Sequence, residues 1–248
     1  MLAVRVRVRS LGADLRPMSP TRVVRDYFDR EAERFDTIYE DLKPWRHRVI
    51  DRVFRGVMRR RLELVRTLGP LPGHWTVLDV GCGSGRFSVE LALRGAAAVV
   101  GIDVAEHMIA LARADARARG VGGRCQFHAA DYLEIDHSER FNLVLAIGYF
   151  DYVEDPYAHL NAMLQQCKTR VLASFPKRFD LRVPTRILRI RAAGGFVRFY
   201  TGSEIARLLD RAGVRSDRAT RIDLGRDYFL IIDRTDNELQ DSRADTGH

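Results

Sequence analysis

Long apolar segments are missing from this chain of 248 residues. No apolar window reaches the roughly 18 residues that a membrane-spanning helix needs, so the sequence predicts no transmembrane segment. No apolar h-region follows the first residues either, so we expect no secretory signal. Both absences favour a globular protein that carries out its function in the cytoplasm.

Cysteine is scarce as well. The chain holds only Cys82, Cys125 and Cys167, an odd number without a C-x-x-C pair. These features argue against a disulfide framework and against a zinc site. The seven histidines show no metal-ligand spacing, so no bound metal is expected. Free thiols fit a reducing compartment, which also favours the cytoplasm.

Acidic residues are outnumbered, and the formal net charge is +8. The excess is concentrated in two segments, because residues 1–25 carry a net +5 and residues 177–198 carry a net +6. The rest of the chain is therefore mildly acidic. Basic segments of this kind suit an anionic partner, which can be a nucleic acid or a small acidic molecule.

A glycine-rich turn is the most informative segment that the chain does contain. The apolar run Val77–Val80 is followed by Gly81, Gly83 and Gly85 at alternate positions, and a helical pattern begins at Arg86. In open α/β sheets, ligands bind at the carboxyl ends of the strands, where such a turn would lie. Glycine permits a positive φ and lets a ligand lie close to the backbone.

The turn differs from the dinucleotide fingerprint G-x-G-x-x-G, because Arg86 stands where the third glycine is expected. Asp79 lies two residues before the first glycine, on the strand itself. A second apolar run, residues 97–102, ends at Asp103. A carboxylate about 20 residues beyond the glycines commonly binds ribose hydroxyls. This feature alone fits any cofactor that carries a ribose.

Residues 77–87 resemble motif I of the class I S-adenosylmethionine (SAM)-dependent methyltransferases. Further matches follow in the same order within residues 76–156. The segment Ala105–Ile109 is similar to the family's D-x-S-x-x-M-I stretch, with alanine in place of serine. Asp131 follows the third predicted strand, and Gly148–Val153 follows the fourth. The resemblance implies SAM as the cofactor and methyl transfer as the activity.

The resemblance also implies a role for each site residue. The glycine turn would lie under the methionine part of SAM, Asp103 on the ribose, Met108 against the adenine and Asp131 on its amino group. The complete implied cofactor-binding set is Asp79, Gly81, Cys82, Gly83, Gly85, Asp103, Val104, Met108, Asp131, Tyr132 and Ile147.

Methyl transfer needs the acceptor atom, methyl group and sulfur to be held in line. A general base is needed only where the acceptor is a weak acid such as a hydroxyl. The catalytic candidates that follow the fourth strand are Tyr149, Asp151, Tyr152 and His159. Tyr149 and Tyr152 can equally be packing aromatics or cation–π partners of the sulfonium.

The predicted fold class is α/β. We expect a Rossmann-like, seven-stranded, mostly parallel sheet with an antiparallel last strand, helices on both faces and an N-terminal helical cap. The predicted units are a disordered or extended segment 1–20, a helical cap 21–68, a SAM-binding domain 69–234 and a disordered tail 235–248.

Three local patterns support this assignment. Pro156 is expected to begin a helix that runs to Gln166. Thr201 and Glu204 have the spacing of a capping box at the start of the last helix. Two strands near residues 215–224 and 227–233 are separated by a short turn, which predicts an antiparallel hairpin.

The residues that would bind the methyl acceptor are expected within 21–66 and 177–200, and the second range includes the basic segment 177–198. Arginines there suit a carboxylate or phosphate on the acceptor. Short runs at residues 174–177 and 198–200 are similar to magnesium-protoporphyrin O-methyltransferases, although the histidine of that group is missing from residues 146–156. The candidate acceptor contacts are Tyr27, Tyr39, Arg198 and Tyr200.

The sequence therefore favours O-methylation of a small, anionic acceptor. An RNA base methyltransferase is an alternative that the basic segments would suit, although the chain lacks the N/D-P-P-Y/F tetrapeptide of amino-group methylators. A catalytically silent SAM-binding module is a second alternative. The sequence makes no prediction about the oligomeric state.

Overall fold

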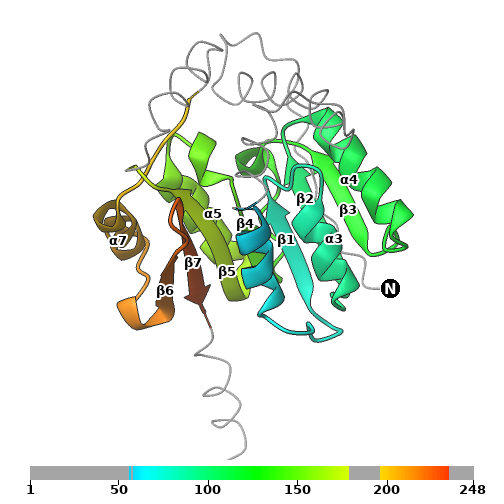
Figure 1. The fold of residues 1–248 in the computed structure, drawn as a ribbon, viewed down its shortest axis with the longest axis horizontal. Coiled ribbons are helices and arrows are strands. Elements are labelled where there is room, and N and C mark those ends of the chain that lie inside the picture. The colour runs from blue at the N-terminus through cyan, green and yellow to red at the C-terminus, as the bar shows by residue number, and fades with distance from the viewer. Residues whose placement is uncertain (1–55, 57, 179–195, 235–248) are drawn as a thin grey trace, which may run out of the picture.

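The computed structural model describes residues 56, 58–178 and 196–234 (Figure 1). Three of the predicted units fall wholly or mostly outside these ranges: the segment 1–20, most of the cap 21–68 and the tail 235–248. Tyr27 and Tyr39 are therefore outside the described residues, as are residues 179–195 of the basic segment.

The core of the protein is one seven-stranded sheet with the order β3-β2-β1-β4-β5-β7-β6 (Figure 1). Neighbouring strands from β3 to β5 pair in parallel, whereas β7 is antiparallel to both β5 and β6. The predicted sheet with an antiparallel last strand is confirmed. The strands are β1 (Thr76–Val80), β2 (Ala98–Asp103), β3 (Cys125–Ala129), β4 (Phe141–Ala146), β5 (Cys167–Pro176), β6 (Ala219–Asp223) and β7 (Asp227–Asp233).

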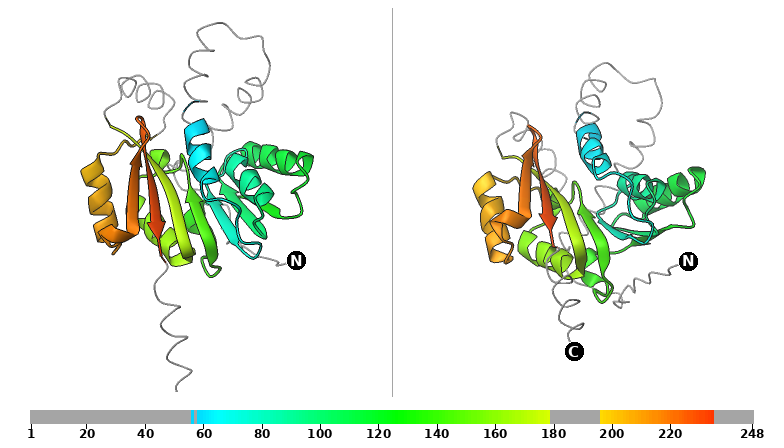
Figure 2. Two further views of the ribbon diagram at one scale, coloured as in Figure 1. Left: turned by 60° about the horizontal axis from the view of Figure 1, so that its bottom comes forward. Right: turned by 90° about the horizontal axis from the view of Figure 1, so that it is seen from below.

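Helices cover both faces of the sheet (Figure 2). Side chains alternate along β1, so that Leu78 and Val80 pack into one core cluster and Val77 into the other. The first cluster includes residues of α5 and α7, and the second includes residues of α3, α4 and the helical residues 58–66. The labelled helices are α3 (Arg86–Leu93), α4 (Glu106–Ala118), α5 (Pro156–Gln166) and α7 (Gly202–Arg211).

The predicted starts of two helices are confirmed. Pro156 begins α5, and the Asp155 side chain accepts hydrogen bonds from the first turn. Thr201 and Glu204 form the capping box of α7. The predicted strand at 215–224 is shorter than expected, because a 3-10 helix, Ser216–Arg218, precedes β6.

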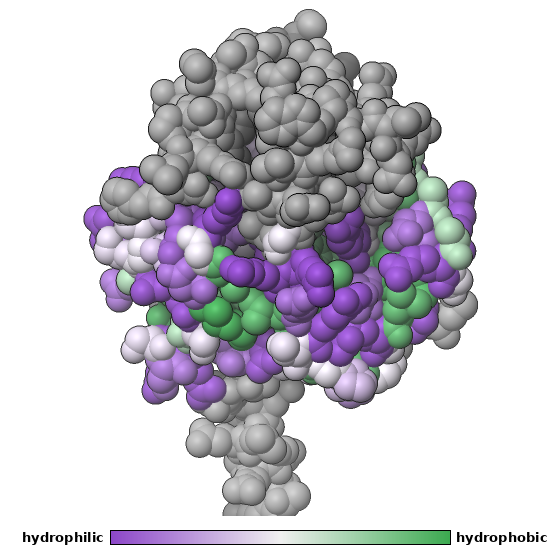
Figure 3. Space-filling model, in the orientation of Figure 1, coloured by the Kyte–Doolittle hydropathy of each residue, from purple (hydrophilic) through white to green (hydrophobic). Residues whose placement is uncertain are grey.

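The described surface is mainly hydrophilic on the face shown in Figure 3. Leu93 and Leu133 are the only large hydrophobic side chains that the described residues leave exposed. No helix within the described ranges is long and apolar enough to cross a bilayer.

Gly85, which precedes α3, supplies a direct test of the packing between the turn and α4. Its φ is +77°, and a Cβ there would stand 2.8 Å from the Cβ of Ala112. Gly85→Ala should therefore lower the free energy of unfolding by about 2–5 kcal/mol, from backbone strain and overpacking together. Gly120→Ala is the matched control, because Gly120 has φ +71° with nothing within 4 Å. It should lose only about 1–2 kcal/mol. Equal losses in urea denaturation would contradict this packing.

Candidate active site

Parallel pairing brings the predicted site residues to one edge of the sheet. The register aligns Asp79 of β1 with Gly101 of β2 and Leu145 of β4, so the turns that follow these strands are neighbours. The backbone N–H groups of Gly81 and Cys82 both donate to the carbonyl of Ile102, at 2.8 and 3.0 Å. The glycine turn is thereby fastened to the end of β2.

The three glycines adopt the conformation that the pattern predicts. Their φ values are +69° for Gly81, +53° for Gly83 and +77° for Gly85. No atom lies within 4 Å of the place where a Cβ on Gly83 would stand. A cofactor can therefore lie directly against this backbone, as the resemblance requires.

Asp103 is fixed between the glycine turn and α4. One carboxylate oxygen accepts the N–H of Gly83 at 2.9 Å, and the other accepts the N–H of Ala105 at 2.9 Å. The side chain is half-buried, like that of its neighbour Val104. This orientation brings the carboxylate to the turn, where a ribose would lie. An open glycine backbone beside an oriented carboxylate fits SAM.

Asp79 has a different environment, because it is buried beneath the turn. Its Oδ2 accepts the hydroxyl of Ser88 at 2.6 Å, which ties β1 to α3. Burial raises the pKa of this carboxyl to about 6, with a further contribution from the negative charge of Asp103. Burial also raises the pKa of the neighbouring Cys82 thiol. Ser88 was not among the candidate residues, and its part in orienting Asp79 is seen only in the structure.

The residues expected around the adenine lie beyond β2 and β3. Met108 is buried against Ala105 on α4. The Asp131 carboxylate accepts the N–H of Leu133 at 3.0 Å and begins a 3-10 helix, Tyr132–Glu134. Tyr132 is a core residue whose hydroxyl donates to Gln166 Oε1 at 2.7 Å. Ile147, after β4, is also buried in the core. The structure brings these residues to the carboxyl end of the sheet, and their contacts with the cofactor stay predictions.

The four catalytic candidates separate into two pairs. The hydroxyl of Tyr149 lies 2.8 Å from Nδ1 of His159, so the corner after β4 is joined to α5. Burial raises the pKa of Tyr149 and lowers the pKa of His159. Both groups are therefore neutral near pH 7, and the tautomer of the imidazole decides which of them donates the hydrogen bond. Asp151 and Tyr152 belong to the 3-10 helix Phe150–Tyr152, in which Asp151 is buried and Tyr152 half-buried.

The two described acceptor candidates are engaged with their own chain. Arg198 donates to the carbonyl of Glu154 at 2.9 Å, and its guanidinium lies 5.4 Å from the ring centroid of Tyr200. Tyr200 is buried, and its hydroxyl donates to the carbonyl of Phe150 at 3.0 Å. In this structure both side chains therefore stabilise the chain that follows β4. Contact with an acceptor stays a prediction for each.

The other described cations of the basic segment have acidic partners. Lys177 pairs with Asp223, and Arg178 pairs with Glu204 at 2.6 Å. Both ends of the segment are fastened together, because Lys177 and Tyr200 form a β-bridge next to the end of β5. The segment therefore leaves and rejoins the fold at the carboxyl edge of the sheet.

A buried ion pair at this edge was not among the predicted site residues. Nε and Nη2 of Arg61 donate to Oδ2 of Asp227 at 3.0 and 2.7 Å, and both side chains are less than one-tenth exposed. The remaining nitrogen, Nη1, contacts the sulfur of Met58 at 3.8 Å. It also lies 3.1 Å from where a Cβ on Gly148 would stand. A detectable signal was present, because Arg61 falls on the apolar stripe of its helix, four residues before Val65.

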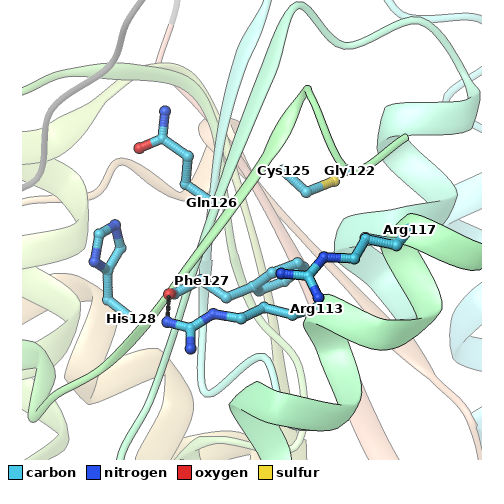
Figure 4. Close-up of a pocket in the computed structure, with 8 residues that line it drawn as sticks. Arg113, Arg117, Gly122, Cys125, Gln126, Phe127 and His128 are labelled. Carbon is cyan, nitrogen blue, oxygen red and sulfur yellow. Dashed lines mark hydrogen bonds between the residues drawn. The ribbon is translucent and has the colours of Figure 1, made fainter. Parts of the chain in front are cut away.

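A cavity of about 330 Å³ lies elsewhere, between α4 and the edge strand β3 (Figure 4). Arg113 reaches across it and donates to the carbonyl of Phe127 at 2.6 Å. None of the candidate site residues lines this cavity. Within the described part of the chain, no group of three or more His, Cys, Asp or Glu residues is arranged to hold a metal ion.

Known proteins provide an independent comparison. Residues 73–175 match the family model of a methyltransferase domain. The ubiquinone biosynthesis O-methyltransferase of Leptothrix cholodnii is 31% identical over 196 residues, which cover 73% of this chain and 82% of that enzyme. A 23S rRNA (uracil(1939)-C(5))-methyltransferase of an Azoarcus species is 39% identical over 80 residues, 32% of this chain and 17% of that enzyme.

Among solved structures, the magnesium protoporphyrin IX methyltransferase of Synechocystis with bound S-adenosylhomocysteine (SAH) has the same fold. The TM-score is 0.67 at 23% identity, and the match covers 86% of this chain and 99% of that one. Since the similarity to the Leptothrix enzyme runs along 82% of its length, and the family model covers the strands that carry the turn, the chain belongs to the class I SAM-dependent methyltransferases and is an enzyme that uses SAM.

Proposed function

We propose that the enzyme transfers the methyl group of SAM to an oxygen atom of a small, anionic acceptor. The observation that carries this proposal is the place where the two described ends of the basic segment meet. Its two ends meet at the Lys177–Tyr200 bridge, at the carboxyl end of β5. The segment holds seven lysines and arginines against one aspartate over residues 177–198. Its charge suits a carboxylate or phosphate on the acceptor.

The order of the strands supports an acceptor-binding site at the carboxyl ends of β4 and β5. Asp103 and Asp131, the residues proposed for the ribose and the adenine, follow β2 and β3 on one side of the glycine turn. The strands β4 and β5 lie on the other side of β1. The methyl group would then face the corner that carries Tyr149 and Tyr152.

Arg61 is proposed to bind the carboxylate of the methionine part of SAM. The corner at Gly148 neighbours the glycine turn, because β1 and β4 are paired. Arg61 Nη1 reaches this corner, and its one described partner is the weak acceptor sulfur of Met58. A charge-assisted hydrogen bond from a guanidinium to a carboxylate is stronger than one to a thioether.

The chain's residues have limited chemical work to do. SAM supplies a methyl group on a positively charged sulfur, which is reactive toward an oxygen nucleophile. The protein has to orient the acceptor and exclude water, and an ionised acceptor needs nothing more. For a hydroxyl acceptor, the neutral imidazole of His159 can take up a proton through the hydroxyl of Tyr149.

The O-methylation named for the Leptothrix relative supports oxygen as the acceptor atom. The match to the rRNA methyltransferase spans only 17% of that enzyme's length. It therefore does not support an RNA acceptor for this chain.

Transfer of radiolabel from methyl-labelled SAM tests the proposal. The acceptor panel should pair hydroxybenzoates with the corresponding hydroxybenzamides, and should include magnesium protoporphyrin IX and total RNA at physiological salt. We expect labelling of the carboxylated acceptors to exceed that of their amides by about tenfold or more. The labelled product should be either a methyl ester, which releases methanol on alkaline hydrolysis, or an alkali-stable methyl ether. Label in RNA alone, or equal labelling of the acids and the amides, would contradict the proposal.

A further inference from the structure

The ring of Tyr149 is packed directly against the first glycine of the turn. A Cβ on Gly81 would stand 2.6 Å from Cδ2 of this tyrosine and 3.3 Å from its Cγ. Gly81 therefore has to be glycine for two reasons, its φ of +69° and this approach of an aromatic ring. Tyr149 is the aromatic residue that the described structure brings into contact with the first glycine.

His159 holds the ring in this position from the other side. The hydroxyl of Tyr149 lies 2.8 Å from its Nδ1, and the two ring centroids are 5.5 Å apart in an edge-to-face arrangement. Phe150 also meets the tyrosine edge-on, at 5.7 Å. With contacts to the turn, to α5 and to the next residue, the ring has little freedom to rotate away.

The electrostatic surroundings suit a positive charge near this ring. The charges of Asp131 and Asp103 act on Tyr149, and both favour its neutral phenol over the phenolate. A neutral aromatic ring attracts a cation to its face. SAM and its product SAH differ at one atom, since the sulfur carries a positive charge in SAM and none in SAH. A ring at the glycine turn is placed to detect this difference.

We propose that Tyr149 recognises the positive charge on the sulfur of SAM, and that its hydrogen bond to His159 positions it to do so. The enzyme thereby binds the methyl donor in preference to the demethylated product. The inference rests on the proposed seat of the cofactor over the glycine turn, and it is independent of the identity of the acceptor. Tyr149 is assigned this contact, and Tyr152 is not.

Calorimetric titration of the full-length protein with SAM and with SAH tests the assignment by the ratio of the two dissociation constants. Tyr149→Leu should reduce the preference for SAM by about two- to thirty-fold, the range of a cation–π contact, and leave SAH binding nearly unchanged. Tyr149→Phe keeps the ring and should keep most of the preference. Tyr157→Leu is the matched control, because Tyr157 is half-buried on α5 beneath Arg211. Its ratio should equal that of the wild type.

Asp103→Asn distinguishes a wrong role for Tyr149 from a wrong position of the cofactor site. The ribose is the same in SAM and SAH, so this substitution should weaken the binding of both ligands. If Asp103→Asn weakens the binding of both ligands while Tyr149→Leu leaves the ratio unchanged, the proposed cofactor site is supported and the role of Tyr149 is wrong. If Asp103→Asn alters neither dissociation constant, the proposed seat is wrong and the assignment falls with it.

The role of His159 predicts a pH dependence of the same ratio. Burial keeps the pKa of His159 below its usual range, and His137 opposes its protonation, whereas Asp131 and Asp155 favour it. The preference for SAM should be constant from pH 8 to about pH 6.5 and should fall at lower pH. Below its pKa the imidazolium adds a positive charge beside the tyrosine and can no longer accept its proton. His159→Gln should keep the preference and should reduce its fall at low pH to the part that protonation of Asp79, whose pKa is about 6, still causes. The same fall in this variant, or no fall in the wild type, would overturn the positioning role.

Discussion

Replacing Asp103 with alanine is expected to weaken SAM binding by about 10²-fold or more. Two charge-assisted hydrogen bonds to the ribose would be lost, each of which contributes about 1.5–3 kcal/mol. The carboxylate also orders the glycine turn, because it accepts hydrogen bonds from the N–H groups of Gly83 and Ala105. Without it the turn loses its tie to the start of α4. Isothermal titration with SAM gives the dissociation constant directly.

An exposed aspartate provides the control for this substitution. Asp217 pairs with Arg215 on the surface, next to β6 and away from the glycine turn. Asp217→Ala should bind SAM as the wild type does. Thermal unfolding should show that Asp103→Ala remains folded at the titration temperature. A folded Asp103→Ala variant with wild-type affinity would remove Asp103 from the cofactor site.

Replacing Arg61 with methionine is expected to lower the free energy of unfolding by about 3–5 kcal/mol. The loss arises because the carboxylate of Asp227 would stay buried without the guanidinium that balances its negative charge. The same variant should lose affinity for SAM, because Nη1 would no longer reach the corner at Gly148. Urea denaturation and calorimetric titration measure the two effects separately.

The double variant Arg61→Met with Asp227→Leu distinguishes a binding role from a structural one. Removing both charges of a buried pair is often neutral or stabilising, so stability should return to within about 1 kcal/mol of the wild type. SAM affinity should stay low, because the cation is still absent. Recovery of affinity together with stability would show that Arg61 only supports the fold.

The parts of this protein that could be predicted from sequence are those determined by short segments. The glycine turn, the start of α5 at Pro156 and the capping box at Thr201 each depend on residues within a few positions of one another. The mostly parallel sheet with an antiparallel last strand followed from the apolar runs and from the resemblance, whereas the order of its strands was not predicted and is seen only in the structure.

The contacts that could not be predicted join residues that are distant in sequence or separated by a corner. Arg61 and Asp227 are 166 positions apart, and nothing in either segment indicates the other. Tyr149 and His159 were both candidates, but their hydrogen bond depends on how α5 returns beneath the corner after β4. The acceptor residues Tyr27 and Tyr39 lie outside the described ranges, so they stay predictions.

A crystal structure of the full-length protein with SAH bound is the most direct test of the proposed site. It should show the ribose hydroxyls on Asp103, the adenine beside Met108 and Asp131, the homocysteine carboxylate on Arg61 and the sulfur near the face of Tyr149. The carboxyl ends of β4 and β5 should remain open to the acceptor. Binding of SAH in another place, such as the cavity between α4 and β3, would contradict this assignment.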